Sequence, residues 1–323
     1  MMREDRRVVA VWLLLCAAVV FAIVVVGGIT RLTRSGLSIV EWQPLVGALP
    51  PLSDADWQAL FAQYRETPEF KRVNFDMQLD GFKRIFWWEY VHRLLGRLAG
   101  LVFLLPFLVF LIRKKLDYLL ALKLAGVFLL GALQGALGWY MVKSGLVDDP
   151  RVSQFRLTAH LGLALLIFSA QFWIALDLLT GRNGNISPIP ILVFLMALSG
   201  GMVAGLRAGS AYNSFPLMNG HLVPPEILMM EPWWRNFGYN MATVQFVHRG
   251  FFWLLLILVP LAWWKARGSA PANLLLAAFA LQAVLGIATL LLKVPVALAA
   301  AHQGGAVALL AAALWYAHRA QLR

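Results

Sequence analysis

Residues 89–93 read EYVHR and residues 245–249 read QFVHR, and in each copy the histidine lies near the start of an apolar stretch of helical length. A second pair follows in the same order, with Thr-Ala-His ending at His160 and Ala-Ala-His ending at His302. The spacing between copies shrinks along the chain because the second half has shorter loops. The sequence therefore predicts an internal repeat with two single histidines in each half.

The composition excludes an ordinary soluble domain. Hydrophobic residues make up 60% of the 323 residues, whereas about half is usual for soluble proteins. Apolar stretches of roughly twenty residues can cross a bilayer, and they must be helical because lipid offers no hydrogen-bond partners to the backbone. We expect an all-α integral membrane protein whose eight transmembrane helices form two pseudo-symmetric four-helix bundles. The predicted spans are 8–29, 87–112, 119–142, 155–179, 188–206, 241–264, 272–293 and 297–317.

The two bundles are expected to comprise residues 1–180 and residues 181–323. The boundary falls in the polar stretch 180–188, whose Gly, Asn, Ser and Pro residues are typical of turns. The long outer connection 31–86 forms most of the mass outside the membrane. Within it, residues 54–64 have the apolar spacing of a short amphipathic helix lying at the membrane surface.

Positive charge indicates the orientation of the chain and not a nucleic-acid partner. The net charge is +12, but the basic residues cluster in ends and short connections that share one side if the N-terminus is cytoplasmic, as the positive-inside rule predicts. We therefore expect a multi-pass protein of the bacterial inner membrane with both termini in the cytoplasm. The clustered residues are Arg3, Arg6, Arg7, Arg113, Lys114, Lys115, Arg182, Lys265, Arg267, Arg319 and Arg323.

Four histidines are expected at similar depth, each within about one to two turns of the outer end of its helix. These four are His92, His160, His248 and His302. Two facing imidazoles in each bundle can supply both axial ligands of a haem iron. Packed histidines are the alternative, and zinc is disfavoured because cysteine or carboxylate ligands and a His-x-x-x-His spacing are absent. His221 and His318 fall outside the pattern and are expected at the solvated surface.

Four arginines are candidates for the haem propionates. Arg93 and Arg249 directly follow two of the histidines, and Arg31 and Arg207 close the first and fifth spans at the outer face. A guanidinium group binds a carboxylate in a fork, which suits propionates near water. Snorkelling toward the lipid headgroups is the alternative.

The repeat is broken at one informative place. Glu89 lies three residues before His92 on the same helical face, and Gln245 holds the matching position in the second half. A carboxylate near the membrane is costly, whereas glutamine keeps the shape and loses the charge. We expect the first half to carry out chemistry with Glu89 and the second to hold a cofactor. The alternative is that Glu89 only forms an ion pair with Arg93 or Arg84.

These residues resemble haem A synthase, the family of membrane enzymes that oxidise haem O to haem A for terminal oxidases. The resemblance covers almost the whole chain and is carried by residues 27–38, 41–44, 89–93, 245–249 and 301–303 and by His160. Some members have a cysteine pair in an outer loop, but Cys16 is the only cysteine here. The chain is therefore similar to the cysteine-free branch found in alphaproteobacteria and mitochondria.

The resemblance implies a b-type haem held by His248 and His302 in the C-terminal half. It implies haem O as the substrate beside His92 and His160, and Glu89 as the carboxylate needed to oxidise a porphyrin methyl group to a formyl group. The electron donor and the source of the oxygen atom stay open. Candidate partners besides the bilayer are a haem O synthase, cytochrome oxidase assembly factors and a second copy of the chain.

Two other functions remain as alternatives. A non-catalytic dihaem b-type electron carrier would also use four histidines, although such carriers usually place two on one helix so that the haems stack across the membrane. A transporter built on a repeat would use helices broken at mid-membrane, and no predicted span is clearly broken there. Analysis of extracted haem separates the three, because a transporter would hold none and a plain cytochrome would hold haem B alone.

Overall fold

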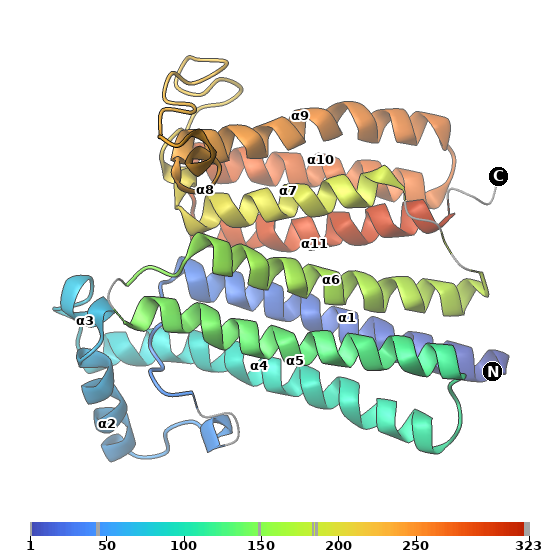
Figure 1. The fold of residues 1–323 in the computed structure, drawn as a ribbon, viewed down its shortest axis with the longest axis horizontal. Helices are drawn as coiled ribbons and strands as arrows, with labels where there is room; N and C mark the ends of the chain where they lie inside the picture. Colours follow the sequence, from blue (N-terminus) through green and yellow to red (C-terminus); the bar gives the residue numbers. More distant parts are fainter. Residues whose placement is uncertain (1, 43–45, 148–149, 183, 185–186, 320–323) are drawn as a thin grey trace.

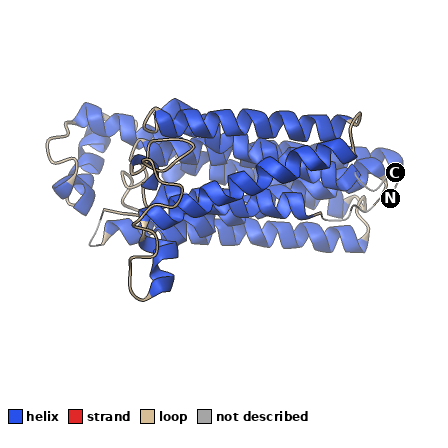
Figure 2. Cartoon of the chain, turned by 90° about the horizontal axis from the view of Figure 1, so that it is seen from above, coloured by secondary structure: helices blue, strands red, loops and turns tan. Residues whose placement is uncertain are grey.

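The computed structural model describes residues 2–42, 46–147, 150–182, 184 and 187–319, and in this part of the chain there are helices and no β-strand (Figure 2). Eight of the described helices are long and apolar enough to cross a membrane, which confirms the predicted fold class. They are α1 (Arg3–Leu32), α4 (Leu79–Ile112), α5 (Tyr118–Leu146), α6 (Gln154–Thr180), α7 (Pro188–Gly205), α9 (Met241–Lys265), α10 (Ala270–Leu291) and α11 (Val296–Arg319).

The eight helices form two rings of four (Figure 1). In the first ring, α1 contacts α4, α4 contacts α5, α5 contacts α6, and α6 returns to α1. In the second, the same order of contacts links α7, α9, α10 and α11. The rings meet where α1 and α6 pack against α11 and α7, and an apolar core of residues from both rings fills this junction.

The ends of the helices follow from local sequence. Asp117 accepts a hydrogen bond from the backbone N–H of Leu120 at the start of α5, and Asn240 accepts from Ala242 N at the start of α9. Such side chains satisfy N–H groups that have no partner inside the helix. At the other end, the backbone beyond α1 and beyond α7 enters the left-handed region at Arg34 (φ 54°) and Arg207 (φ 55°). The two halves thus end their first helices in the same way.

The outer connection 31–86 is more helical than predicted. The amphipathic helix is present as α2 (Asp54–Arg65), and a further short helix, α3 (Pro68–Arg72), follows it. Trp57 and Tyr64 of α2 are 8% and 0% exposed and pack on aromatic side chains of α4. The expected placement of this apolar face on the membrane surface is therefore wrong, because α4 covers it.

Helix α4 begins at Leu79, well before the predicted start at residue 87. The prediction that His92 lies within two turns of the start of its helix is wrong for this reason. The extra turns of α4 are stabilised by the aromatic cluster with α2, in which the rings of Trp57 and Phe86 make an edge contact with their centroids 4.9 Å apart. The other three histidines do lie within about two turns of the start of their helices.

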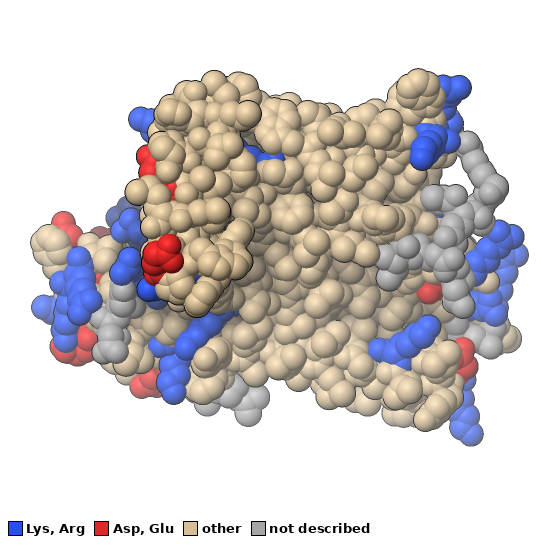
Figure 3. Space-filling view, turned by 45° about the horizontal axis from the view of Figure 1, so that its top comes forward, with Lys and Arg blue, Asp and Glu red and all other residues tan. Residues whose placement is uncertain are grey.

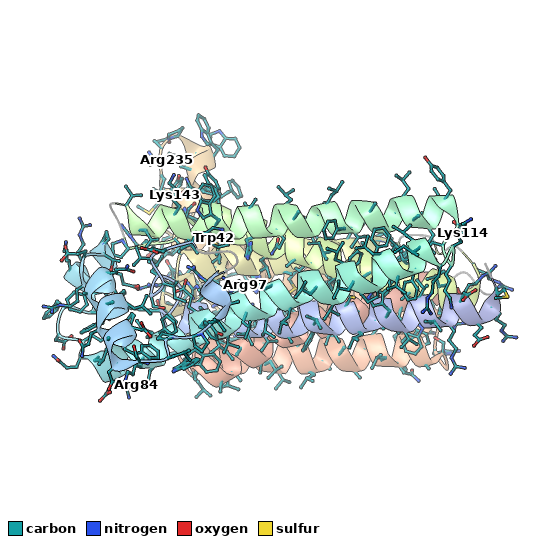
Figure 4. The ribbon with its side chains drawn as sticks, turned by 90° about the horizontal axis from the view of Figure 1, so that it is seen from below. Trp42, Arg84, Arg97, Lys114, Lys143 and Arg235 are labelled. Carbon is teal, nitrogen blue, oxygen red and sulfur yellow. The ribbon has the colours of Figure 1, made fainter. Side chains whose placement is uncertain are left out.

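Charged side chains gather toward the two ends of the face shown in Figure 3, with a broad band of other residues between them. In Figure 4, Lys114 lies at one end of the bundle, whereas Trp42, Arg84, Lys143 and Arg235 lie at the other. Helix α1 starts and α11 ends at the same end as Lys114 (Figure 1). The molecule is a multi-pass membrane protein with its longest connections on one side.

Two further predictions have clear outcomes. His221 is exposed, as expected. His318 is 5% exposed, so its expected place at the solvated surface is wrong. Its Nε2 lies 2.9 Å from Asp177 Oδ1 and its ring makes an edge contact with Trp173, which ties the end of α11 to α6. Residues Gln43 and Pro44 of the sequence motif and Arg323 of the basic tail lie outside the described residues.

Candidate functional site

Each of the four repeated histidines lies against a glycine of the neighbouring helix. A Cβ atom on Gly27 of α1 would lie 2.8 Å from His92 Nε2, and one on Gly200 of α7 would lie 3.2 Å from His248 Cε1. Gly27 and Gly200 occupy matching places in the repeat. Only a residue without a side chain lets the imidazole approach the adjacent helix so closely.

The second histidine of each half has the same surroundings in both bundles. A Cβ on Gly138 would lie 2.9 Å from His160 Cε1, and one on Gly286 would lie 2.8 Å from His302 Cε1. A glutamine side chain from the same helix as the glycine holds the histidine backbone in each case. Gln134 Nε2 donates to the carbonyl of His160 at 3.0 Å, and Gln282 Nε2 donates to that of His302 at 2.9 Å.

The ring nitrogens of these histidines suit axial ligation of a haem. The Nδ1 atoms of His160 and His302 are buried and have no hydrogen-bond partner among the described residues, and His160 Nε2 lies 3.4 Å from Gln134 Nε2. A buried imidazole nitrogen without a protein partner is free to bind a metal, and such a polar atom is otherwise costly. His92 and His160 come from helices of the first ring, and His248 and His302 come from helices of the second. The residues present therefore fit one bis-histidine haem in each bundle.

A compact metal centre does not arise from the described residues. No group of three or more His, Cys, Asp or Glu side chains among them is arranged to hold a metal ion. A structural zinc site needs four such ligands and a catalytic one usually three. A haem iron takes four of its ligands from the porphyrin, so paired histidines are enough for it.

The two bundles differ in how they are closed beside the histidines. In the second bundle, Phe252 of α9 and Phe279 of α10 stack with ring centroids 6.2 Å apart, and Phe279 is 4% exposed. The matching residues of the first bundle are Gly96 and Gly131. A Cβ on either glycine would meet no atom within 4 Å. The position filled by two aromatic rings in the second bundle therefore holds no side chain in the first, where both glycines are exposed.

Aromatic closure in the first bundle occurs deeper. Phe103 of α4 and Phe128 of α5 stack with centroids 6.3 Å apart. Phe103 lies seven residues beyond Gly96 and Phe128 three residues before Gly131, so at 1.5 Å per residue the aromatic pair is shifted by about 10 Å along α4 and by about 4 to 5 Å along α5. We refer to the region bounded by Gly96, Gly131 and this aromatic pair as the deep slot.

Glu89 is 2% exposed and fully hydrogen-bonded. Its Oε2 accepts from Ser38 Oγ and from Ile39 N, each at 2.8 Å. Its Oε1 accepts from Arg93 Nε at 3.0 Å and Nη2 at 2.6 Å. The ion pair with Arg93, expected as the alternative role of Glu89, is present. These four donor atoms hold the carboxylate in one orientation. Ser38 and Ile39 tie it to the connection that follows α1, and Glu89 itself lies on α4, one helical turn from His92.

Gln245 occupies the same place in the second bundle with a neutral side chain. Its Nε2 donates to the carbonyl of Ala208 at 2.9 Å, and its Oε1 accepts from Arg249 Nη2 at 3.0 Å. Arg249 also donates to backbone carbonyls of the following connection, including that of Tyr212 at 3.1 Å. In both bundles, these side chains thus join the second helix to the connection that follows the first helix. They differ by the charge at position 89.

Arg93 and Arg249 hold the connections that follow α1 and α7. Arg93 donates to the carbonyls of Ile39 (2.8 Å) and Glu41 (3.1 Å) and lies over the ring of Trp42 at 5.5 Å. The expected contact of Arg93 and Arg249 with haem propionates stays a prediction. In addition, both arginines hold the outer loops in place through backbone carbonyls. Arginine forks are well suited to bind several carbonyl oxygens at once.

Three other guanidinium groups gather at the junction of the bundles. Arg31, Arg34 and Arg207 repel one another electrostatically. Burial, with the nearby charge of Arg34, lowers the pKa of Arg207. Glu69 of α3 is 4% exposed, and burial together with the charge of Glu89 raises its pKa to about 7, against the opposing effect of Arg34 and Arg207. Clustered arginines of this kind bind carboxylates, which keeps Arg31 and Arg207 as propionate candidates.

Several site residues were not singled out from the sequence. Arg34, not Arg31, matches Arg207, and counting from Gly27 and Gly200 would have shown this. The contacts of Gln134 and Gln282 with the following histidine helix are tertiary features. Ser38 lies within the residues 27–38 that carry the resemblance, but its contact with Glu89, and the place of Glu69 on α3, depend on how the outer connection folds.

The chain is similar to known proteins over nearly its whole length. Residues 10–314 match the COX15-CtaA family, described as cytochrome oxidase assembly protein. A protein of Nitrosospira multiformis named Heme A synthase is 60% identical, over 97% of this chain and 93% of its own. Proteins of the same name from Parvibaculum lavamentivorans (48% identical, 98% and 95% covered) and from Wolbachia pipientis wMel (43%, 97% and 92%) are also similar.

Proposed function

The chain belongs to the COX15-CtaA family of cytochrome oxidase assembly proteins, and from that premise we propose that it is an oxidoreductase that converts haem O to haem A. The relatives named Heme A synthase, which match nearly the whole chain, support this enzyme and not a dihaem electron carrier. Two bis-histidine sites in similar bundles support a haem substrate and a haem cofactor in one molecule.

We assign the substrate to the first bundle, between His92 and His160, and a b-type haem to the second, between His248 and His302. The observation that carries this assignment is the pair Glu89 and Gln245. Both residues bind the arginine four residues further on and a group in the connection after the preceding helix, so a neutral side chain can also hold these segments together. A buried charge kept in only one of two equal frameworks points to chemistry there.

The deep slot supports the same assignment. Haem O carries a long isoprenoid chain on its porphyrin, whereas haem b carries a short vinyl group at that position. The first bundle is open at Gly96 and Gly131, and the second is closed by Phe252 and Phe279. The bundle with the longer interior is the better fit for the larger molecule.

The reaction converts a methyl group to a formyl group. With water as the oxygen source, it releases four electrons and four protons; the alternative is that O₂ supplies the oxygen. The bound haem b supplies one-electron transfer. Glu89 takes up a proton from the reacting carbon or opposes positive charge that develops on it. At about 6 Å and an effective dielectric constant of about 20, such an anion lowers the energy of a unit positive charge by about 3 kcal/mol.

The environment of Glu89 keeps it ready for this role. Arg93 and Ser38 fix the carboxylate, so no reorientation is needed when charge develops. Ile39 N donates to the same oxygen as Ser38, which ties the site to the outer connection and excludes water from that side. The carboxylate is thus held by the fold before substrate binds.

We propose that the protein lies in the bacterial inner membrane with both termini in the cytoplasm. The basic connection that contains Lys114 lies at the end where α1 starts and α11 ends, in keeping with the positive-inside rule (Figure 4). The haem sites then lie toward the outer leaflet. A haem O synthase, oxidase assembly factors, an electron donor and a second copy of the chain remain predicted partners.

The test is the variant Glu89→Gln, which removes the charge at nearly constant side-chain size and gives the first bundle the residue of the second. We expect haem O to remain bound and haem A to be absent when extracted haems are separated by chromatography. The matched control is Gln245→Glu, which should leave haem A formation intact. Normal haem A content in Glu89→Gln would refute the role of Glu89.

A further inference from the structure

His92 and His248 hold matching places in the repeat, but only His248 has a side-chain partner. Ser199 Oγ lies 2.8 Å from His248 Nδ1. Among the hydrogen bonds of the described residues, none involves the ring of His92. Ser199 directly precedes Gly200, so its counterpart before Gly27 is Val26, which offers no polar side-chain atom.

The contacts of Ser199 set the tautomer of His248. The hydroxyl has a single proton, and Ser199 Oγ lies 2.7 Å from the carbonyl of Met196, which can only accept. Ser199 therefore donates to Met196 and accepts from the N–H at His248 Nδ1. The proton on Nδ1 leaves the lone pair of Nε2 available for a metal.

The first bundle lacks this arrangement. The carbonyl of Val26 accepts from Thr30 Oγ1 at 2.9 Å, within the helix, and takes no part in holding His92. The rings also face their glycines differently, with Nε2 of His92 nearest to Gly27 and Cε1 of His248 nearest to Gly200. The second histidines His160 and His302 share the backbone contact with a glutamine in both halves, and Gln134 Nε2 also lies 3.4 Å from His160 Nε2. Of the four histidines, His248 alone has a hydroxyl group of a described residue against its Nδ1.

We propose that Ser199 is a positioning residue that fixes His248 as a lasting axial ligand of the cofactor haem, and that Val26 leaves His92 unfixed so that the substrate porphyrin is exchanged at each turnover. This inference rests on the proposed function, in which one haem stays and the other enters and leaves. The partner of a ligating histidine orients the ring and strengthens the metal bond, and its loss usually weakens metal affinity by about 10- to 100-fold.

The test compares Ser199→Ala, Ser199→Thr and Val26→Ser in the purified full-length protein. Transfer of haem to apomyoglobin in excess gives the rate at which each haem leaves. We expect Ser199→Ala to release haem B roughly 10- to 100-fold faster and to shift its midpoint potential upward, because the imidazole donates less electron density. Ser199→Thr, which keeps the hydroxyl, should restore both values. Val26→Ser should slow the release of haem from the first bundle.

The result that overturns the inference is an unchanged haem B release rate and potential in Ser199→Ala. Faster release that Ser199→Thr fails to restore would also overturn it, because the effect would then come from packing and not from the hydroxyl. The release rate and the midpoint potential of haem B can be measured whether or not haem A is formed. Absence of haem A formation by the unaltered protein would refute the proposed function while leaving the haem B release rates interpretable.

Discussion

Filling the deep slot should separate haem O from haem b. The double variant Gly96→Phe/Gly131→Phe places in the first bundle the two rings that Phe252 and Phe279 contribute to the second. Both glycines face open space, so the change does not displace existing side chains near the Cβ positions. It does remove the space between the two glycines and the pair Phe103–Phe128, which is about 10 Å along α4 and about 4 to 5 Å along α5.

The size of the effect follows from the cost of forcing a chain into occupied space. Overpacking in a well-filled interior costs about 1–3 kcal/mol, which corresponds to roughly 5- to 150-fold weaker binding of haem O. Haem b in the second bundle should be unaffected, because its own closure is unchanged. The control Gly131→Ala adds one methyl group to open space and should bind haem O normally.

The assay is titration of the purified variants with haem O, followed by absorbance in the Soret region, together with the KM for haem A formation. Weaker haem O binding with full haem b content is the expected result. If the double variant binds and oxidises haem O as the unaltered protein does, the isoprenoid chain does not use the deep slot, and this support for the substrate half is lost.

Three further predictions concern packing and charge. Gly138→Ala should lower pigment in the first bundle, because the new methyl group would lie 2.9 Å from His160 Cε1; equal haem content by pyridine haemochrome would contradict this. His318→Ala should destabilise the protein by about 1–3 kcal/mol, since it removes the buried ring and its contact with Asp177, which keeps the hydrogen bond from Gly184 N, and thermal unfolding in detergent measures it. Because burial raises the pKa of Glu69 from 4.5 to about 7, its contribution to stability is full below pH 4.5 and is lost as the pH rises through 7. The loss is about 3 kcal/mol. Glu69→Gln should therefore flatten the dependence of thermal stability on pH between 4.5 and 7. An unchanged slope would be inconsistent with a buried, titrating carboxyl group at this position.

The membrane helices were predictable because a bilayer imposes length and hydropathy on each span. The predicted spans 119–142 and 241–264 correspond to helices Tyr118–Leu146 and Met241–Lys265. The start of α4 was not predictable in this way. Its first turns lie against Trp57 and Tyr64 of a separate helix, and such tertiary packing leaves no periodic signal in α4 itself.

The site was predictable to the extent that it depends on one helix or on the repeat. Glu89 and Arg93 are four residues apart, so helical geometry alone allows their ion pair. The contact of Ser38 with Glu89 spans 51 positions in the sequence, and that of Asp177 with His318 spans 141. These pairs form only when the helices assemble. Serine, aspartate and histidine are also common in ordinary loops and at helix ends, so the residue types alone do not indicate the contacts.

The most direct measurement of the central claim is the haem content of two purified double variants. His248→Ala/His302→Ala should lose haem B, whereas His92→Ala/His160→Ala should keep haem B and lose haem O and haem A, as judged by pyridine haemochrome spectra and chromatography of the extracted pigments. If both variants retain every haem of the unaltered protein, the paired histidines are not the ligands, and the account of the two bundles is wrong.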